Sequence, residues 1–253
     1  MSALSTCKRP LRDFLARNPF VSPLTFGFFY REKMRAIHRM APELPFKDIL
    51  EVGGGQSGLT RLLYPHANIT NLDMDPSFAN APCNMQEGVR FVHGDATRLE
   101  FASASFDAVT MFDVIEHVPD DQKAMSEVLR VLKPGGYVLV SVPNENWRFP
   151  YYRFMKNMCP REAEKFAEWG HVRRGYSLEQ LSNLIAIPRE SSATFINPLT
   201  VLCHDVAFSN APARVRKAVC MALWPLTWLA YAAHRPGSKG TETASAWRKP
   251  PKN

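Results

Sequence analysis

The chain has 253 residues, of which 45% are hydrophobic and 22% are charged, and its formal net charge is +7. These values are ordinary for a globular protein and exclude a wholly disordered chain, a collagen and a coiled coil. The five cysteines are scattered, with no CxxC pair, which argues against a disulfide scaffold or a zinc site and favours a cytoplasmic protein. No apolar run follows the basic start, so no secretory signal is predicted.

The charge is unevenly distributed along the chain. Residues 1–47 carry nine basic and three acidic side chains, residues 48–143 six and thirteen, and residues 144–253 sixteen and eight. An acidic centre therefore lies between two basic flanks, which indicates different partners for different parts of the chain. The basic flanks suit the phosphates of nucleic acid, anionic lipid or an acidic substrate.

The first 46 residues are expected to form an N-terminal arm and a helix. Residues 1–23 contain three prolines and basic side chains, which favour an irregular arm. Apolar residues at helical spacing over residues 24–40 predict an amphipathic helix that ends near Pro42 and Pro45.

From residue 47 onward the pattern alternates between strands and helices. Strands are expected over residues 48–52, 68–73, 89–95, 106–112 and 137–142, and helices over 59–64 and 122–132. This alternation predicts a Rossmann-like α/β fold, with a doubly wound, mostly parallel sheet and helices on both faces. We expect this domain to span residues 47–200. In such sheets ligands bind outside the carboxyl ends of the strands, where acidic residues fall in this sequence.

The segment that follows the fifth strand is expected to cover the pocket. Residues 144–176 are rich in aromatic side chains and predict a cap insertion. Ser177 and Gln180 form a capping box that starts a helix running to about Ile187, and residues 191–196 are expected to form a further strand.

The last part of the chain, residues 201–253, is expected to form an amphipathic helical extension and a tail. Residues 218–233 carry no charge, Pro225 interrupts them, and basic residues flank them. A bilayer span needs ~20 apolar residues, so an interfacial helix is predicted, with peripheral membrane contact through residues 212–235. The alternative is an ordinary amphipathic helix that covers the sheet. The tail from Gly237 is expected to be disordered.

A glycine-rich turn carries the strongest chemical signal. Gly53 to Gly58 join the first strand to a helix, and glycine lets the backbone approach a ligand closely. Asp73 ends the second strand, where a carboxylate can accept both hydroxyls of a ribose, and Asp95 ends the third. Glu51 precedes the turn and would repel a pyrophosphate. These acids favour S-adenosylmethionine, which is cationic and has no phosphate, over a dinucleotide. The alternative is a tight turn with solvated acids.

Five motifs across residues 47–143 resemble those of the class I S-adenosylmethionine-dependent methyltransferases of the type 11 family: ILEVGGGQSG, NLDMD, GDATRLEF, FDAVTMFDVIEHVPD and LKPGGYVLVSVPN. The resemblance implies S-adenosylmethionine as cofactor and a set of binding residues. These are Glu51, Gly53, Gly54, Gly55 and Gly58 at the methionine moiety, Asp73 at the ribose, Met74, Asp95 and Ala96 at the adenine, and Phe112 and Asp113 near the methyl group. Ser57 occupies the family's third glycine position and Gly58 follows it, so a differently shaped turn is expected.

His117, just after the fourth strand, is the predicted general base, because an ordinary histidine pKa of about 6.5 suits proton transfer. The alternative is that His117 only caps or packs. Asp113, Glu116 and His117 also match the D/E-x-x-E-H pattern that binds a divalent metal in the ubiquinone-pathway O-methyltransferases. Because the same letters occur in relatives without a metal, no metal is predicted.

The aromatic cap predicts an apolar or ring-bearing methyl acceptor. The candidate acceptor contacts are Trp147, Tyr151, His171 and Arg174, although helix entry and surface charge also explain the last two. We therefore expect a methyltransferase that acts on a small-molecule or lipid-linked acceptor. A nucleic-acid methyltransferase is a weaker hypothesis, since no N/D-P-P-Y/F follows the fourth strand and acids line the mouth. A cofactor-binding regulatory subunit without turnover stays open.

Overall fold

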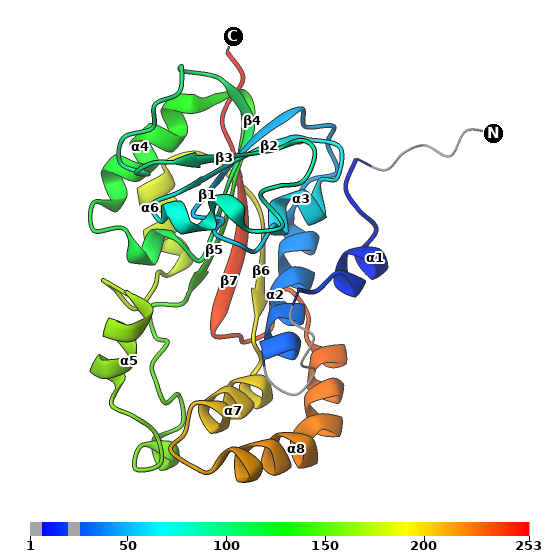
Figure 1. The fold of residues 1–253 in the computed structure, drawn as a ribbon, viewed down its shortest axis with the longest axis vertical. Coiled ribbons are helices and arrows are strands. Elements are labelled where there is room, and N and C mark those ends of the chain that lie inside the picture. The colour runs from blue at the N-terminus through cyan, green and yellow to red at the C-terminus, as the bar shows by residue number, and fades with distance from the viewer. Residues whose placement is uncertain (1–6, 20–25, 253) are drawn as a thin grey trace, which may run out of the picture.

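A seven-stranded sheet forms the centre of the computed structural model, which describes residues 7–19 and 26–252 (Figure 1). The strand order is β3-β2-β1-β4-β5-β7-β6. The strands are β1 (Asp48–Val52), β2 (Asn68–Asp73), β3 (Val89–His93), β4 (Phe106–Phe112), β5 (Leu132–Pro143), β6 (Arg189–Phe195) and β7 (Glu242–Arg248). The pairings among β1 to β5 are parallel, and β7 runs antiparallel to both β5 and β6. The predicted Rossmann-like, mostly parallel sheet is confirmed.

Helices cover both faces of this sheet. The helices are α1 (Leu11–Ala16), α2 (Phe26–Met40), α3 (Leu59–Leu63), α4 (Asp121–Val131), α5 (Glu162–Trp169), α6 (Leu178–Ile185), α7 (Pro198–Ala207) and α8 (Ala213–Ala233), with short 3₁₀ turns at Pro76–Asn80, Ile115–His117 and Arg153–Met155. One core cluster joins α1, α2 and α3 to one face, and a second joins α4 and α6 to the other. Because neighbouring strand residues point to opposite faces, Ile49 enters the first cluster and Leu50 the second.

The N-terminal part is more ordered than a wholly irregular arm. Pro10 precedes α1, and Phe14 and Leu15 of this helix are buried in the cluster that α2 also joins. The expectation of an irregular arm is therefore wrong for residues 11–16, because two adjacent apolar side chains give this short helix a face to bury. Residues 1–6 and 20–25 lie outside the described residues, and the predicted amphipathic helix is present as α2.

The C-terminal tail contains the largest departure from expectation. Residues 242–248 were expected to be disordered, but they form β7, which lies between β5 and β6 (Figure 1). The small side chains of Ala244 and Ala246 enter the α2 cluster, and Trp247, 1% exposed, enters the other. Small residues alternating with hydroxyls carry a weak strand signal, and only pairing on both edges makes this segment a strand. The predicted division of the chain into residues 1–46, 47–200 and 201–253 otherwise stays a prediction.

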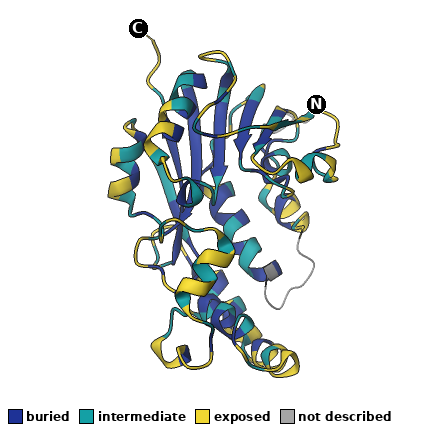
Figure 2. Cartoon of the chain, turned by 60° about the vertical axis from the view of Figure 1, so that its left-hand side comes forward, coloured by how far each residue is buried: buried dark blue, intermediate teal, exposed yellow. Residues whose placement is uncertain are grey.

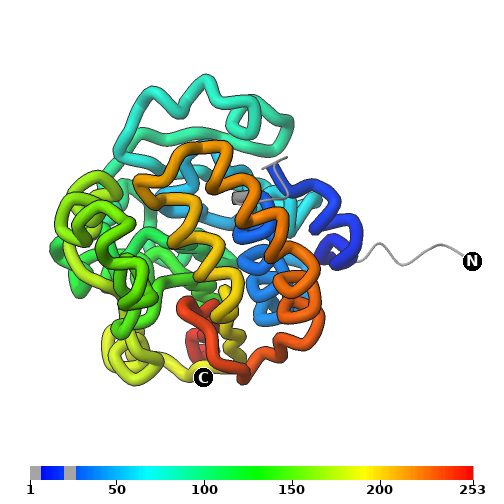
Figure 3. The backbone as a smooth tube through the Cα atoms, turned by 90° about the horizontal axis from the view of Figure 1, so that it is seen from below, coloured from blue at the N-terminus to red at the C-terminus, as the bar shows by residue number. Residues whose placement is uncertain are grey.

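Three of the helices that follow β5 lie beyond the carboxyl ends of the parallel strands. Figure 1 shows α5, α7 and α8 below the sheet, at the end where β7 begins and β5 therefore finishes. The predicted capping box is confirmed, since Ser177 and Gln180 bond reciprocally at the start of α6. In Figure 3, α7 and α8 run side by side, and Cys203 and Cys220 contribute to the apolar cluster that they share with Trp147.

Helix α8 continues through Pro225 and packs on α7 rather than on the sheet. Its buried side chains are Cys220, Thr227 and Tyr231, whereas several large apolar side chains on it are exposed. Figure 2 shows the contrast between the buried strands and the more exposed helices at this lower end. Within residues 7–19 and 26–252, no helix is both long and apolar enough to cross a membrane.

Candidate cofactor and active site

A cavity of about 570 Å³ lies at the carboxyl ends of β1, β2, β3 and β4. The predicted site residues that line it are Gly53, Asp73, Met74, Asp95, Ala96, Asp113 and His117. Four carboxylates line this cavity, since Asp120 joins Asp73, Asp95 and Asp113, and no lysine or arginine among residues 7–19 and 26–252 lines it. Such a lining suits a cationic, phosphate-free nucleoside and disfavours a pyrophosphate.

A smaller pocket of about 120 Å³ adjoins this cavity, and Val52 and Gly53 line both. The predicted residues Glu51, Gly54 and Phe112 line the smaller pocket. Helix α2 also contributes Tyr30 and Lys33, which the sequence analysis did not select. The sequence does show a lysine on an otherwise apolar helix face, which is a possible sign of a functional residue. Its contact with the pocket, however, depends on the packing of α2 against the sheet.

Two glycines of the turn pack so closely against neighbouring side chains that a Cβ has no room. Gly53 has φ +65°, and a Cβ there would lie 2.6 Å from Cγ2 of Val114. Gly58 has φ +58° at the start of α3, where a Cβ would lie 2.7 Å from Cβ of Cys83. The expected shift of the last glycine by one residue thus places it at a left-handed position that favours glycine. These two positions explain why the turn tolerates no larger residue there.

Hydrogen bonds hold the acids of the turn in place. The Gly55 N–H donates to Oδ2 of Asp73 at 2.9 Å, which ties the turn to the end of β2. Glu51 is 3% exposed and accepts a hydrogen bond from the Thr60 N–H at 3.3 Å. Burial raises the pKa of Glu51, and the hydrogen bonds from Thr60 and the nearby Lys33 only partly oppose this effect. Glu51 is therefore a buried side chain, which does not fit the alternative of a tight turn with solvated acids.

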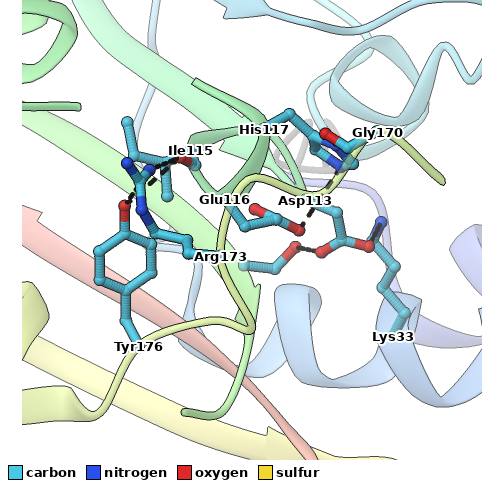
Figure 4. Close-up of polar contacts among 9 residues, drawn as sticks. Lys33, Asp113, Ile115, Glu116, His117, Gly170, Arg173 and Tyr176 are labelled. Atoms are coloured by element: carbon cyan, nitrogen blue, oxygen red, sulfur yellow. Dashed lines mark hydrogen bonds and ion pairs between the residues drawn. The ribbon is translucent and has the colours of Figure 1, made fainter. Parts of the chain in front are cut away.

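Asp113 is held by partners from two other elements (Figure 4). Its carboxylate accepts from Nζ of Lys33 at 2.6 Å and from Oγ of Ser141 at 2.6 Å. Asp113 has φ +55°, a conformation that costs energy for a residue with a Cβ. Burial opposes the charge on Lys33, but the Asp113 carboxylate and Tyr30 outweigh burial, so the pKa of Lys33 lies above its ordinary value.

His117 lies beside Glu116 and His171 (Figure 4 shows the first two). Nδ1 of His117 is 3.1 Å from the Gly170 carbonyl oxygen, so in the neutral ring this nitrogen carries the proton and Nε2 is the free base. Nε2 lies 3.9 Å from Oε1 of Glu116, and the His117 and His171 ring centroids are 4.6 Å apart. The sequence predicts His171 as a candidate acceptor contact and gives no sign of its contact with His117.

Glu116 is fully buried, and within the described part of the chain neither of its carboxylate oxygens has a hydrogen-bond partner. Burial, with a further contribution from Asp113, raises the pKa of Glu116 well above its ordinary value. Burial and the nearby His117 lower the pKa of His171 to about 4. Burial thus favours the uncharged forms of Glu116 and His171.

These three residues are also the ones whose geometry suits a metal. One ligand atom each from Glu116, His117 and His171 lies within 4.8 Å of the others. Asp113 is not part of this group, because Lys33 and Ser141 engage its carboxylate. The three residues of the D-x-x-E-H pattern therefore do not form one ligand group, because His171 takes the place of Asp113. The expectation that no metal is used stays a prediction.

Three of the four candidate acceptor residues lie in one cluster, because the Trp147 and His171 ring centroids are 6.2 Å apart and Nη1 of Arg174 donates to the Trp147 carbonyl at 3.3 Å. Trp147 is 6% exposed and stacks on Phe166 with centroids 5.7 Å apart. Arg174 makes two hydrogen bonds to the Glu162 carboxylate, at 2.9 and 2.7 Å. Tyr151 lines a different cavity, and only His171 lies near His117. Trp147 and Arg174 thus have structural partners, and their predicted roles at an acceptor stay predictions.

Comparisons with known proteins agree with this geometry. Residues 50–140 match the family model described as a methyltransferase domain. The chain is 33% identical over 200 residues to phthiotriol/phenolphthiotriol dimycocerosates methyltransferase 1 of Mycobacterium ulcerans, covering 74% of this chain and 65% of the relative. It is 39% identical over 117 residues to the corresponding Mycobacterium leprae methyltransferase, covering 43% of each. The chain thus spans less than two thirds of the length of either relative.

The fold has close counterparts among solved structures. A structure from Thermotoga maritima, described as a SAM-dependent methyltransferase and possible histamine N-methyltransferase, superposes with a TM-score of 0.59. Its sequence identity is 20%, and the match covers 94% of this chain and 98% of that one. Such a likeness establishes the fold alone. Taken with the family model over residues 50–140 and the sequence relatives, it shows that the chain contains a methyltransferase domain with the fold of the S-adenosylmethionine-dependent methyltransferases.

Proposed function

We propose that this protein transfers a methyl group from S-adenosylmethionine to a lipid-linked or other apolar small-molecule acceptor. The observation that carries the cofactor assignment is the cavity lined by four carboxylates and, within the described part of the chain, by no lysine or arginine, next to a glycine turn that a side chain would fill. The two mycobacterial relatives, whose names specify dimycocerosate lipids as substrates, support an acceptor of the lipid class.

The proposed cofactor residues contact three parts of S-adenosylmethionine, which are the ribose, the adenine and the methionine moiety. Asp73 accepts the ribose hydroxyls, and Met74, Asp95 and Ala96 contact the adenine at the same cavity. Glu51, Gly53 and Gly54 face the methionine moiety in the smaller pocket, together with Phe112. Lys33 supplies a buried positive charge in that pocket, which suits a carboxylate.

The chain's own part in the reaction is to position the acceptor and move one proton. When bound, the cofactor supplies a methyl group on a sulfonium, which is already a strong electrophile. Alignment of the acceptor supplies much of the rate in such a displacement. Nε2 of His117 takes the acceptor proton, while the Gly170 carbonyl holds the ring through Nδ1. His171, neutral near neutral pH, packs on His117 without adding charge.

Contact with a membrane surface would bring a lipid-linked acceptor to the site. Helix α8 exposes large apolar side chains, which are Val215, Val219, Met221, Trp224, Leu226 and Leu229. Arg214 and Lys217 lie exposed near its start. Because α8 lies at the end of the molecule where the parallel strands finish, this helix and the cavity are at the same end (Figure 1). Exposed apolar side chains beside cations suit an anionic bilayer.

A methyl-transfer assay tests the activity. The protein is incubated with labelled S-adenosylmethionine and a panel of long-chain diols, quinols and single-stranded RNA. We expect label in a lipid-phase acceptor, and an Asp73→Asn variant is expected to lose most of it, whereas exposed Asp13→Asn is not. Label in RNA would instead support a nucleic-acid methyltransferase. S-adenosylhomocysteine binding without transfer to any acceptor would support a regulatory subunit.

A flotation assay tests the membrane contact separately. We expect the protein to float with phosphatidylglycerol vesicles and the Leu226→Asp/Leu229→Asp variant to stay at the bottom. Met85→Asp is the matched control, because Met85 is 73% exposed and lies outside α8. Equal flotation of all three proteins would contradict contact through α8.

A further inference from the structure

A second cavity, of about 710 Å³, lies at the carboxyl end of β5, beside the start of β7 and the end of β6. It shares no lining residue with either of the pockets assigned to the cofactor. Its walls come from the segment after β5, from the start of α6 and from the segment between α8 and β7. The two cavities are therefore separate places on the same edge of the sheet.

The charge of this second cavity is opposite to that of the first. Arg148, Arg153 and Lys239 line it, and Glu145 is its one carboxylate. All three cations are exposed, and among the described residues none of them has an ion-pair partner. By contrast, Arg174 of the same cap segment is paired with Glu162. The lining thus carries three positive charges against one negative charge, and these cations are available to a ligand.

The walls of this cavity also contain uncharged polar side chains, and hydrogen bonds fix the segments that carry them. The Asn144 amide donates to the Gly240 carbonyl at 2.9 Å and accepts from Thr243 Oγ1 at 2.7 Å, which ties the segment after β5 to the segment before β7. Thr241 lines the cavity and is 5% exposed, and its hydroxyl has no hydrogen-bond partner within the described residues. A buried hydroxyl without a partner costs free energy, so a ligand that accepts its proton would be favoured.

We propose that this cavity binds the phosphate group of an anionic ligand. Three cations that line one cavity, together with a hydroxyl at its wall, match the several charged oxygens of a phosphate monoester better than the two of a carboxylate, and arginine pairs with phosphate in a bidentate manner. Tyr151 and Leu178 add apolar wall to the same cavity and suit a non-polar portion of the ligand. The phosphate belongs either to a soluble phosphate ester or to a lipid headgroup, and the chemistry at the cavity is the same for both.

Titration calorimetry with two soluble probes separates these sources. Glycerol 3-phosphate carries the phosphate alone, and dihexanoyl phosphatidic acid carries it with short acyl chains. We expect both to bind. Equal affinities indicate a soluble ester, and tighter binding of the acylated probe by at least about tenfold indicates a lipid headgroup. Binding should weaken as salt rises, because exposed charges are screened.

Variants decide whether the binding belongs to this cavity. The Arg148→Gln/Arg153→Gln/Lys239→Gln protein is expected to bind both probes at least tenfold more weakly. The control replaces three exposed cations outside the cavity, Arg12→Gln/Lys123→Gln/Lys252→Gln, and is expected to match the wild type. Single Lys239→Gln, expected to weaken binding about threefold, serves if the triple variant does not fold. Failure of both probes to bind, or equal loss in the control, would overturn the proposal, and S-adenosylhomocysteine affinity reports separately on the cofactor site.

Discussion

The two sides of the cofactor cavity are built in different ways. On one side, Asp73 is the last residue of β2, Gly53 directly follows β1 and Asp95 comes two residues after β3, so adjacent parallel strands bring them together. On the other side, Asp113 and His117 depend on contacts from distant segments, namely Lys33 of α2, Ser141 of β5 and Gly170 after α5. The first side is thus set by local sequence and sheet topology, whereas the second requires the complete tertiary structure. Variants on the two sides should therefore have different effects.

The largest effect is expected on the glycine side. Gly53→Val places a side chain against Val114 at a backbone φ of +65°, so S-adenosylhomocysteine affinity should fall by more than about a hundredfold in calorimetry. Gly237→Val is the control, since no heavy atom lies within 4 Å of the Cβ position there. Near-normal affinity of Gly53→Val would mean that the cofactor does not lie against the turn.

The next largest effect is expected on the His117 side, and in turnover rather than binding. His117→Ala removes the proposed proton acceptor and should lower kcat about a hundredfold, while S-adenosylhomocysteine affinity stays within twofold. The exposed His66→Ala variant should keep full turnover. If His117→Ala keeps its kcat, the general-base role is wrong. The His117 side of the cavity would then differ from the glycine side only in how its side chains pack.

A stability effect is expected at Glu116. Its pKa is raised in the folded state, so the folded protein holds this proton more strongly than the unfolded chain. Below the ordinary glutamate pKa both states are protonated, and as the pH rises above it the folded state progressively loses free energy relative to the unfolded state. Glu116→Gln removes this cost and should raise the melting temperature by a few degrees at pH 8, about 1 kcal/mol, and by less at pH 5.

Thermal melts of the wild type and Glu116→Gln at both pH values measure this effect. The exposed Glu87→Gln variant is the control and should show no pH-dependent gain. A Glu116→Gln protein that melts lower than the wild type at pH 8 would show that the ionised carboxylate is a stabilising part of the structure.

The smallest effect is expected from metal removal. Because Asp113 is engaged by Lys33 and Ser141, the Glu116, His117 and His171 group lacks the aspartate of the D-x-x-E-H pattern. Methyl transfer after treatment with EDTA should stay within twofold of the untreated value. A large loss that Mg²⁺ or Mn²⁺ restores would instead make this group a metal site and change the role of His117.

The elements of the parallel sheet could be predicted because their signals are local. Strands 48–52, 68–73 and 106–112 match β1, β2 and β4, since short apolar runs bounded by glycine, proline and acidic residues carry their own signal. The acids that line the cavity could be placed for the same reason, because parallel strands end at one edge of the sheet.

The rest depended on partners that are distant in the sequence. Strand β7 has no strong apolar run and is a strand because β5 and β6 supply partners on both of its edges. Lys33 enters the site because α2 packs on the sheet, and His171 meets His117 because the chain returns after α5. The sequence alone thus determined the positions of the central strands along the chain and the acidity of their ends, which are short-range properties. The tertiary structure decided the last strand, the partners of Asp113 and His117, and the separation of an acidic cavity from a basic one, because each of these depends on contacts between segments whose own sequences do not encode them.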